Sequence, residues 1–72
     1  MHEKVVNGIR ERRTAAGLTQ EELAAAMGVS RQTIISIERE RYIPSLALAL
    51  KLARYFDCPT DALFKITRGR SA

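Results

Sequence analysis

The feature that most constrains this chain is the three-residue connection Gly28-Val29-Ser30 between two segments that each carry helix-starting signals. Thr19 is followed at Glu22 by the acidic partner of a capping box, which starts one helix, and Gly28 can end it in a left-handed conformation. The hydroxyl of Ser30 can cap the next helix. The chain is therefore predicted to turn sharply between two short helices.

Two helices joined by a three- or four-residue turn that contains glycine form a helix-turn-helix, which we expect over residues 20 to about 39. A helix from Asn7 to Ala16 is expected before it, ending at Gly17. After Pro44, Ser45 caps a helix that extends to Phe56, and a short helix starts at Pro59 or Thr60. The pattern predicts five helices.

Both ends of the chain have a different pattern. Residues 4–6 and 64–67 are short, and the second segment alternates apolar and polar residues and includes β-branched ones. We expect two short strands, paired either with each other or with those of a second copy. Residues 68–72 are expected to form a loose tail.

Length and composition indicate one small folded domain over residues 1–72. No apolar run is long enough to cross a bilayer, so no membrane partner is expected, and the N-terminus does not have the pattern of a signal peptide. A single cysteine favours a reducing compartment, so the expected location is the cytoplasm. The net charge of +4 favours polyanions without identifying one.

Enzyme chemistry has little support in the sequence. His2 is the one histidine, and Cys58 precedes a proline without a basic partner nearby. We find no metal-ligand set, phosphate-binding glycine loop or nucleophile motif. We therefore expect no catalytic activity, no cofactor, no metal and no small-molecule ligand.

The third helix has two chemically distinct sides. At 100° per residue, Ile34 and Ile37 point toward the rest of the domain, while Gln32, Ser36 and Arg39 point away and Arg31 lies at the flank. A guanidinium can donate two hydrogen bonds to guanine, and a side-chain amide can form two with adenine. This face is predicted to contact DNA bases, the alternative being an ordinary solvated surface.

Backbone contacts are predicted around that helix. Gln20 follows the N-cap of the second helix, where free backbone N–H groups favour a phosphate, and its amide can bridge a phosphate and the next helix. Basic and aromatic residues on both sides of the third helix are candidates for contacts with sugar and phosphate: Arg10, Arg39, Arg41 and Tyr42.

The motifs "TQEELA", "GVSRQTI", "IE" and "PSL" occur together between Ile9 and about Phe64. In this combination the chain resembles the Cro/CI-type (Xre family) helix-turn-helix domain. The resemblance implies an all-α, five-helix, lambda-repressor-like fold that binds double-stranded DNA and regulates transcription. It also implies base contacts from Arg31, Gln32 and Ser36, a phosphate contact from Gln20, a backbone contact near Thr33, and an ion pair between Arg13 and Glu38.

Small stand-alone dimeric repressors are the members that this chain resembles most. They imply a homodimer on a palindromic operator, with short strands at the chain ends. The residues expected at the dimer interface are Val5, Val6, Phe56, Leu63, Phe64 and Ile66. The alternative function is an antitoxin-like or accessory module that uses the same fold to hold a protein partner.

The sequence departs from the family pattern at three places. Arg12 replaces the usual leucine, and Arg39-Glu40 replaces the common Asn-Gly, which removes a helix-ending glycine. Ile35 stands at a usually polar position. It is expected either to contact a thymine methyl group as part of the base-contacting set or to widen the contact with the core.

Overall fold

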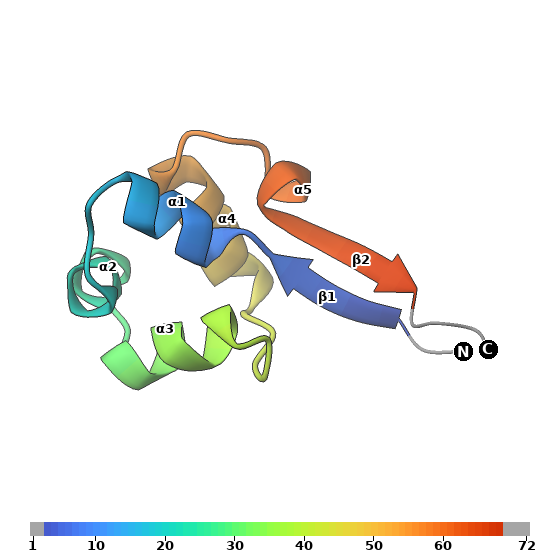
Figure 1. Ribbon diagram of the computed structural model, residues 1–72, viewed down its shortest axis with the longest axis horizontal. Coiled ribbons are helices and arrows are strands. Elements are labelled where there is room, and N and C mark those ends of the chain that lie inside the picture. The colour runs from blue at the N-terminus through green and yellow to red at the C-terminus, as the bar shows by residue number, and fades with distance from the viewer. Residues whose placement is uncertain (1–2, 69–72) are drawn as a thin grey trace.

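The computed structural model describes residues 3–68 of the chain. Figure 1 shows a group of helices from which two strands extend on one side. The order of elements in this part of the chain is β1 (Glu3–Asn7), α1 (Ile9–Ala15), α2 (Gln20–Met27), α3 (Arg31–Glu38), α4 (Leu46–Tyr55), α5 (Thr60–Leu63) and β2 (Phe64–Arg68). His2 and tail residues 69–72 lie outside the described residues.

Local hydrogen bonds set the starts of three helices. The side-chain hydroxyls of Thr19, Ser30 and Ser45 accept from backbone N–H groups three residues later, at 3.0, 3.1 and 3.2 Å. The Glu22 carboxylate completes the predicted capping box by accepting from the backbone N–H of Thr19 at 2.9 Å. These contacts satisfy N–H groups that have no partner inside a helix. The predicted starts of α2, α3 and α4 are confirmed.

The helix expected from Asn7 begins at Ile9 instead. Asn7 ends β1, and Gly8, directly after it, donates its backbone N–H to Leu63 O at 3.0 Å. The Asn7 side chain then accepts from the backbone N–H of Ile9 at 3.1 Å. Because the two ends of the chain pair with each other, Asn7 and Gly8 are not part of the helix in which they were expected.

The two strands form an antiparallel pair within the chain. Lys4 lies opposite Thr67, Val5 opposite Ile66, and Asn7 opposite Phe64. The fold is thus mostly helical with a two-stranded sheet, and the all-α class was too narrow. The sheet extends away from the helices along the long axis of the molecule (Figure 1). The molecule measures 40 × 23 × 23 Å along its principal axes.

The core is formed by one or two large apolar residues from each helix. Its fully buried members are Ile9, Leu23, Ile34, Ile37, Leu52 and Leu63. Val29, from the turn between α2 and α3, packs against them, as do Phe56 and Phe64. Leu63 is 1% exposed, so its assignment to a dimer interface was wrong: α5 directs this side chain into the domain's own core.

We expect Thr19→Ala to lower the free energy of unfolding by about 1 kcal/mol, because it removes the hydroxyl that accepts from Glu22 N. Thr14→Ala is the matched control, since the Thr14 hydroxyl donates to Arg10 O and Glu11 O within α1. This control is expected to change stability by less than about 0.5 kcal/mol. Urea denaturation of both variants measures the difference, and equal effects would contradict the role of the cap.

Candidate nucleic-acid interface

Helix α3 is held by one side and exposed on the other. Ile34 and Ile37 are fully buried, while Arg31 and Gln32 are exposed at the N-terminal end of the helix. Ser36 and Ile35 are half-buried, and Ile35 lies outside the cluster of core residues. The structure therefore brings the four predicted base-contacting residues onto the part of one helix that the core does not use.

Hydrogen bonds order the polar side chains of this face. Gln32 Nε2 donates to Ser36 Oγ at 3.4 Å, one helical turn along. The hydroxyls of Ser30 and Thr33 lie 2.9 Å apart, next to the cap that starts the helix. Tyr42 lines a shallow pocket together with these same polar residues of α3 and its cap, so its ring lies beside the face. A ligand on this face would meet amide and hydroxyl groups first.

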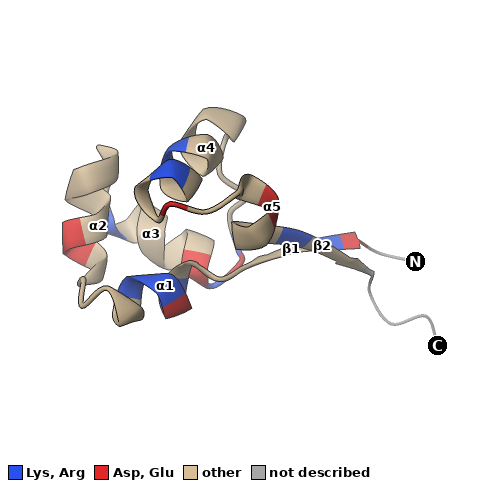
Figure 2. Ribbon diagram, turned by 90° about the horizontal axis from the view of Figure 1, so that it is seen from above, with Lys and Arg blue, Asp and Glu red and all other residues tan. Residues whose placement is uncertain are grey.

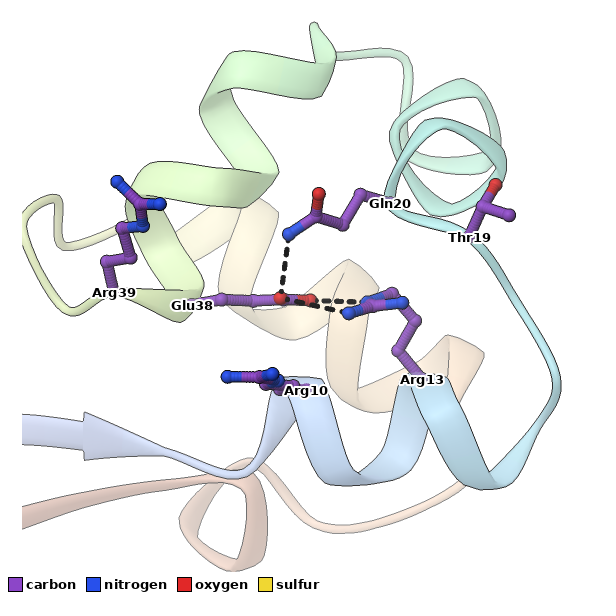
Figure 3. A pocket seen from close by; sticks show the side chains of 6 residues that line it. All are labelled: Arg10, Arg13, Thr19, Gln20, Glu38 and Arg39. Atoms are coloured by element: carbon purple, nitrogen blue, oxygen red, sulfur yellow. Dashed lines mark hydrogen bonds and ion pairs between the residues drawn. The ribbon is translucent and has the colours of Figure 1, made fainter.

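A surface pocket of about 460 Å³ separates α3 from α1 and the start of α2. Figure 3 shows the six side chains that line it: Arg10, Arg13, Thr19, Gln20, Glu38 and Arg39. Three of these are arginines and one is a carboxylate, and Arg10 and Arg39 are exposed. A cationic pocket at the N-terminal end of a helix is suited to a phosphate.

The Glu38 carboxylate is buried beneath this pocket and is fully engaged. Arg13 Nε donates to Glu38 Oε2 at 2.6 Å and Arg13 Nη2 donates to Oε1 at 3.2 Å. The two side chains are 11% and 3% exposed, and Arg13 Nη1 also donates to Leu18 O at 2.8 Å. The hydrogen bond that Arg13 donates to Glu38 raises the pKa of Arg13 above its already high ordinary value, so the arginine stays charged. The ion pair expected from the family resemblance is present.

Gln20 contacts the same carboxylate from the second helix. Its Nε2 donates to Glu38 Oε1 at 3.1 Å, so the expected link between Gln20 and the next helix exists (Figure 3). An amide nitrogen carries two N–H donors, which leaves one for a phosphate oxygen. The phosphate contact itself stays a prediction.

The predicted backbone-contacting residues lie on both sides of α3. Arg10 and Arg39 reach the pocket, while Arg41 and Tyr42 are exposed in the segment that follows the helix. Thr33 is half-buried between the cap and Tyr42. Figure 2 shows that other basic residues are distributed over α1, α4 and β1, so charge alone would not have located this face.

Several polar contacts were not predicted from the sequence. Asn7 Nδ2 donates to Ile37 O at 2.9 Å, and Lys51 Nζ donates to Met27 O at 3.0 Å, so each satisfies a carbonyl near the end of a helix. Glu40 adopts a left-handed backbone conformation and contacts Asn7. The missing glycine at this position was the one sequence signal for the last contact.

The residues proposed for dimerisation have different environments. Val5 and Val6 are half-buried in the sheet, and Phe56 and Phe64 pack partly against the core, whereas Ile66 is exposed. Other large apolar residues are exposed on α4 or just before it: Ile43, Leu46 and Leu50. Ile43 and Ile66 line one surface depression, which lies between the strands and the segment that precedes α4.

Other kinds of site are not supported by the described residues. Within residues 3–68 no three side chains of His, Cys, Asp or Glu are grouped so that they could hold a metal ion. None of the helices in that range has the length and apolar content needed to cross a membrane.

Comparison with known proteins identifies the same segment. Residues 9–63 match the helix-turn-helix family HTH_3. A protein of Archaeoglobus fulgidus described as an uncharacterized HTH-type transcriptional regulator is 52% identical over 56 residues, which cover 78% of this chain and 80% of that protein.

Solved structures also superpose on this chain and support the same helix-turn-helix fold. The restriction-modification controller protein C.AhdI from Aeromonas hydrophila superposes with a TM-score of 0.68 at 41% identity, over 75% of this chain and 82% of its own. The transcriptional regulator VanUg superposes with a TM-score of 0.75 over 96% of this chain and 92% of its own; at 18% identity it supports the fold alone.

Removing one partner of the buried ion pair is expected to cost about 3 kcal/mol of unfolding free energy, because Glu38→Ala leaves the Arg13 charge buried and unpaired. Arg13→Met combined with Glu38→Leu should cost less than Glu38→Ala alone, since no unpaired charge remains. Glu21→Ala on the exposed side of α2 is the control and should have little effect. Urea denaturation of the three variants tests this, and a Glu38→Ala loss as small as that of the control would contradict it.

Proposed function

Because the chain belongs to the helix-turn-helix family HTH_3 and is a transcriptional regulator with that DNA-binding fold, we propose that it binds double-stranded DNA sequence-specifically and represses transcription. In this proposal a homodimer places one α3 in each of two successive major grooves, about 34 Å apart. The operator is then an approximate palindrome.

The observation that carries this proposal is the division of α3 into a buried and an exposed side. Ile34 and Ile37 hold the helix, while Arg31 and Gln32 are exposed at its N-terminal end. In a helix-turn-helix, residues near the start of the second helix contact base edges. Arg31 and Gln32 carry the groups that form bidentate contacts with guanine and adenine.

The cationic pocket supports the phosphate contacts. Glu38 is neutralised by Arg13, so the exposed guanidinium groups of Arg10 and Arg39 dominate the pocket that Gln20 also lines. Such contacts orient a protein on the duplex without carrying sequence information. We propose that this pocket binds the DNA backbone on one side of the major groove. Arg41 and Tyr42 would contact the DNA backbone on the other side.

Exposed apolar residues support dimerisation. Leu46 and Leu50 are 72% and 50% exposed and lie one turn apart on the side of α4 that faces away from the core. Ile43, in the segment before α4, and Ile66 of β2 are also exposed and line one surface depression. Exposed apolar surface on a small domain often marks a protein–protein interface, whose centre is rich in apolar side chains. The proposed dimer surface is therefore Ile43, Leu46, Leu50 and Ile66.

Occupation of a promoter by such a dimer is sufficient for repression, and no catalytic step is required. We also propose that the protein works in the cytoplasm, because the relatives it resembles come from archaea and bacteria, in which the DNA lies in the cytoplasm.

Selection of bound duplexes from a random DNA pool tests the function directly. We expect a palindromic site whose affinity falls steeply between about 50 and 200 mM salt, because phosphate contacts release counterions. Gln32→Ala should lower specific affinity by roughly 1 to 3 kcal/mol for each lost bidentate contact and relax base preference in each half-site.

Arg41→Ala is the matched comparison and should weaken binding to all sequences alike. Equal effects of the two variants on every sequence would contradict the assignment of base contacts. Absence of binding at low salt, or binding insensitive to salt, would favour the protein-interaction alternative.

Leu50→Glu is expected to convert the dimer to a monomer, since it places a charge in the proposed apolar surface. Ala26→Glu introduces the same charge on the exposed side of α2 and should leave the dimer intact. Sedimentation equilibrium of both variants gives the mass. A monomeric unsubstituted protein, or a Leu50→Glu dimer, would rule out this surface.

A further inference from the structure

Four helices of this chain end in the same backbone turn, but with different residues at its left-handed position. In each, two N–H groups donate back to carbonyls of the last turn; after α3 these are Glu40 N to Ile37 O and Arg41 N to Ser36 O, both at 2.9 Å. The left-handed residues are Gly17 and Gly28, both with φ of 73°, Glu40 with 62° and Asp57 with 55°. Glycine adopts this conformation freely and aspartate tolerates it, whereas glutamate is poorly suited to it.

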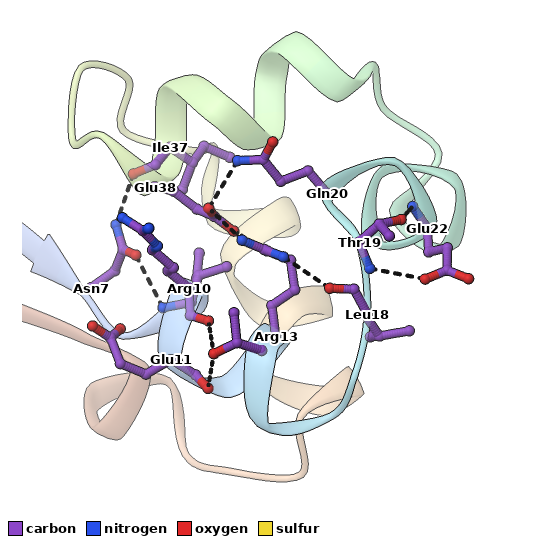
Figure 4. A network of polar contacts seen from close by, with 12 residues as sticks. Asn7, Arg10, Glu11, Arg13, Leu18, Thr19, Gln20, Glu22, Ile37 and Glu38 are labelled. Carbon is purple, nitrogen blue, oxygen red and sulfur yellow. Dashed lines mark hydrogen bonds and ion pairs between the residues drawn. The ribbon is translucent and has the colours of Figure 1, made fainter.

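The side chain of Glu40 forms contacts that offset the unfavourable left-handed conformation of its backbone. Its Oε2 accepts from the backbone N–H of Asn7 at 3.3 Å, and its Oε1 lies 3.3 Å from Lys4 Nζ. Asn7 in turn donates its Nδ2 to Ile37 O at 2.9 Å, as Figure 4 shows. We call these four residues, Lys4, Asn7, Ile37 and Glu40, the strand–helix clamp. The clamp joins Lys4 and Asn7 of β1 to the C-terminal end of α3.

The clamp contacts the C-terminal end of α3, and Arg31 and Gln32 lie at the opposite, N-terminal end of the same helix. An eight-residue helix is about 12 Å long, so a tilt of about 10° at one end moves the other end by about 2 Å. Contacts with fixed hydrogen-bond geometry tolerate displacements of only about 0.5 Å. A contact that holds the end of α3 therefore bears directly on where its first residues meet the bases.

We propose that Glu40 and Asn7 are positioning residues that set the angle of α3 against the β1–β2 sheet and thereby the sequence specificity of the protein. The inference rests on the proposed function of α3 in contacting bases. Glu40 itself acts through α3 and forms no base contact.

Glu40→Gly and Asp57→Gly form a matched pair for testing the clamp. Each removes one negative charge and places glycine at a left-handed position, but Asp57 has no side-chain hydrogen bond or ion pair among residues 3–68. The segment that carries Asp57, between α4 and α5, lies along the edge opposite α3 in Figure 1. Asp57→Gly should raise the melting temperature by roughly 4 °C. Glu40→Gly should raise it less, although glutamate is the more strained residue, because the contacts of Glu40 with Asn7 and Lys4 are lost.

Specificity is measured as the ratio of the affinity for the selected DNA site to that for a random-sequence duplex at one salt concentration. Asp57→Gly should leave this ratio unchanged. Glu40→Gly should lower it at least about fivefold, the loss expected for one bidentate base contact. Glu40→Gln removes the same charge but keeps an oxygen that can accept from Asn7 N, so it should stay within about twofold of the unsubstituted protein.

Two results would overturn the proposal. If Glu40→Gly gains at least as much thermal stability as Asp57→Gly, the contacts of Glu40 are too weak to hold the end of α3. If the specificity ratio of Glu40→Gly is unchanged, or that of Glu40→Gln falls equally far, the clamp does not position α3 through Asn7. Failure of the proposed function is distinguishable, because the unsubstituted protein and Asp57→Gly would then show no preference for any duplex.

Discussion

The Glu38 carboxylate is the constraint on which the arrangement of the first three helices depends. A carboxylate that is 3% exposed must be paired, and Arg13 of α1 and Gln20 of α2 provide the donors. Arg13 also holds the carbonyl of Leu18, in the segment between α1 and α2. One buried charge thus joins α1, the start of α2 and the end of α3, and Figure 4 shows these contacts as one continuous network.

The same network determines the charge of the surface above it. Without Arg13, the negative charge of Glu38 would repel a phosphate in the pocket. Because Arg13 balances that charge, Arg10 and Arg39 make the pocket positively charged. The net charge of +4 says little by itself, since basic residues also lie on α4 and β1 (Figure 2). The placement of Arg10 and Arg39 beside α3 is what favours a polyanion here.

Sequence reasoning succeeded where the signal is local and failed where a residue's partner is far along the chain. The helix-turn-helix followed from Thr19, Gly28 and Ser30, because caps and turns are hydrogen bonds over a few residues. Leu63 was misassigned because a four-residue helix is too short for its pattern to distinguish an inward from an outward face. The ion pair was anticipated only through resemblance to a family.

The sequence by itself determined the starts of α2, α3 and α4 and which side of α3 is buried, since capping and apolar periodicity act within each helix. Only the tertiary structure decided that the two terminal strands pair with each other and that Asn7 belongs to β1 rather than to α1. It also decided the direction of Glu40, whose carboxylate faces Asn7, 33 residues away in the chain. The physical reason is that a contact between residues far apart in the chain depends on how the whole chain packs, and the pattern of neighbouring residues does not specify that packing.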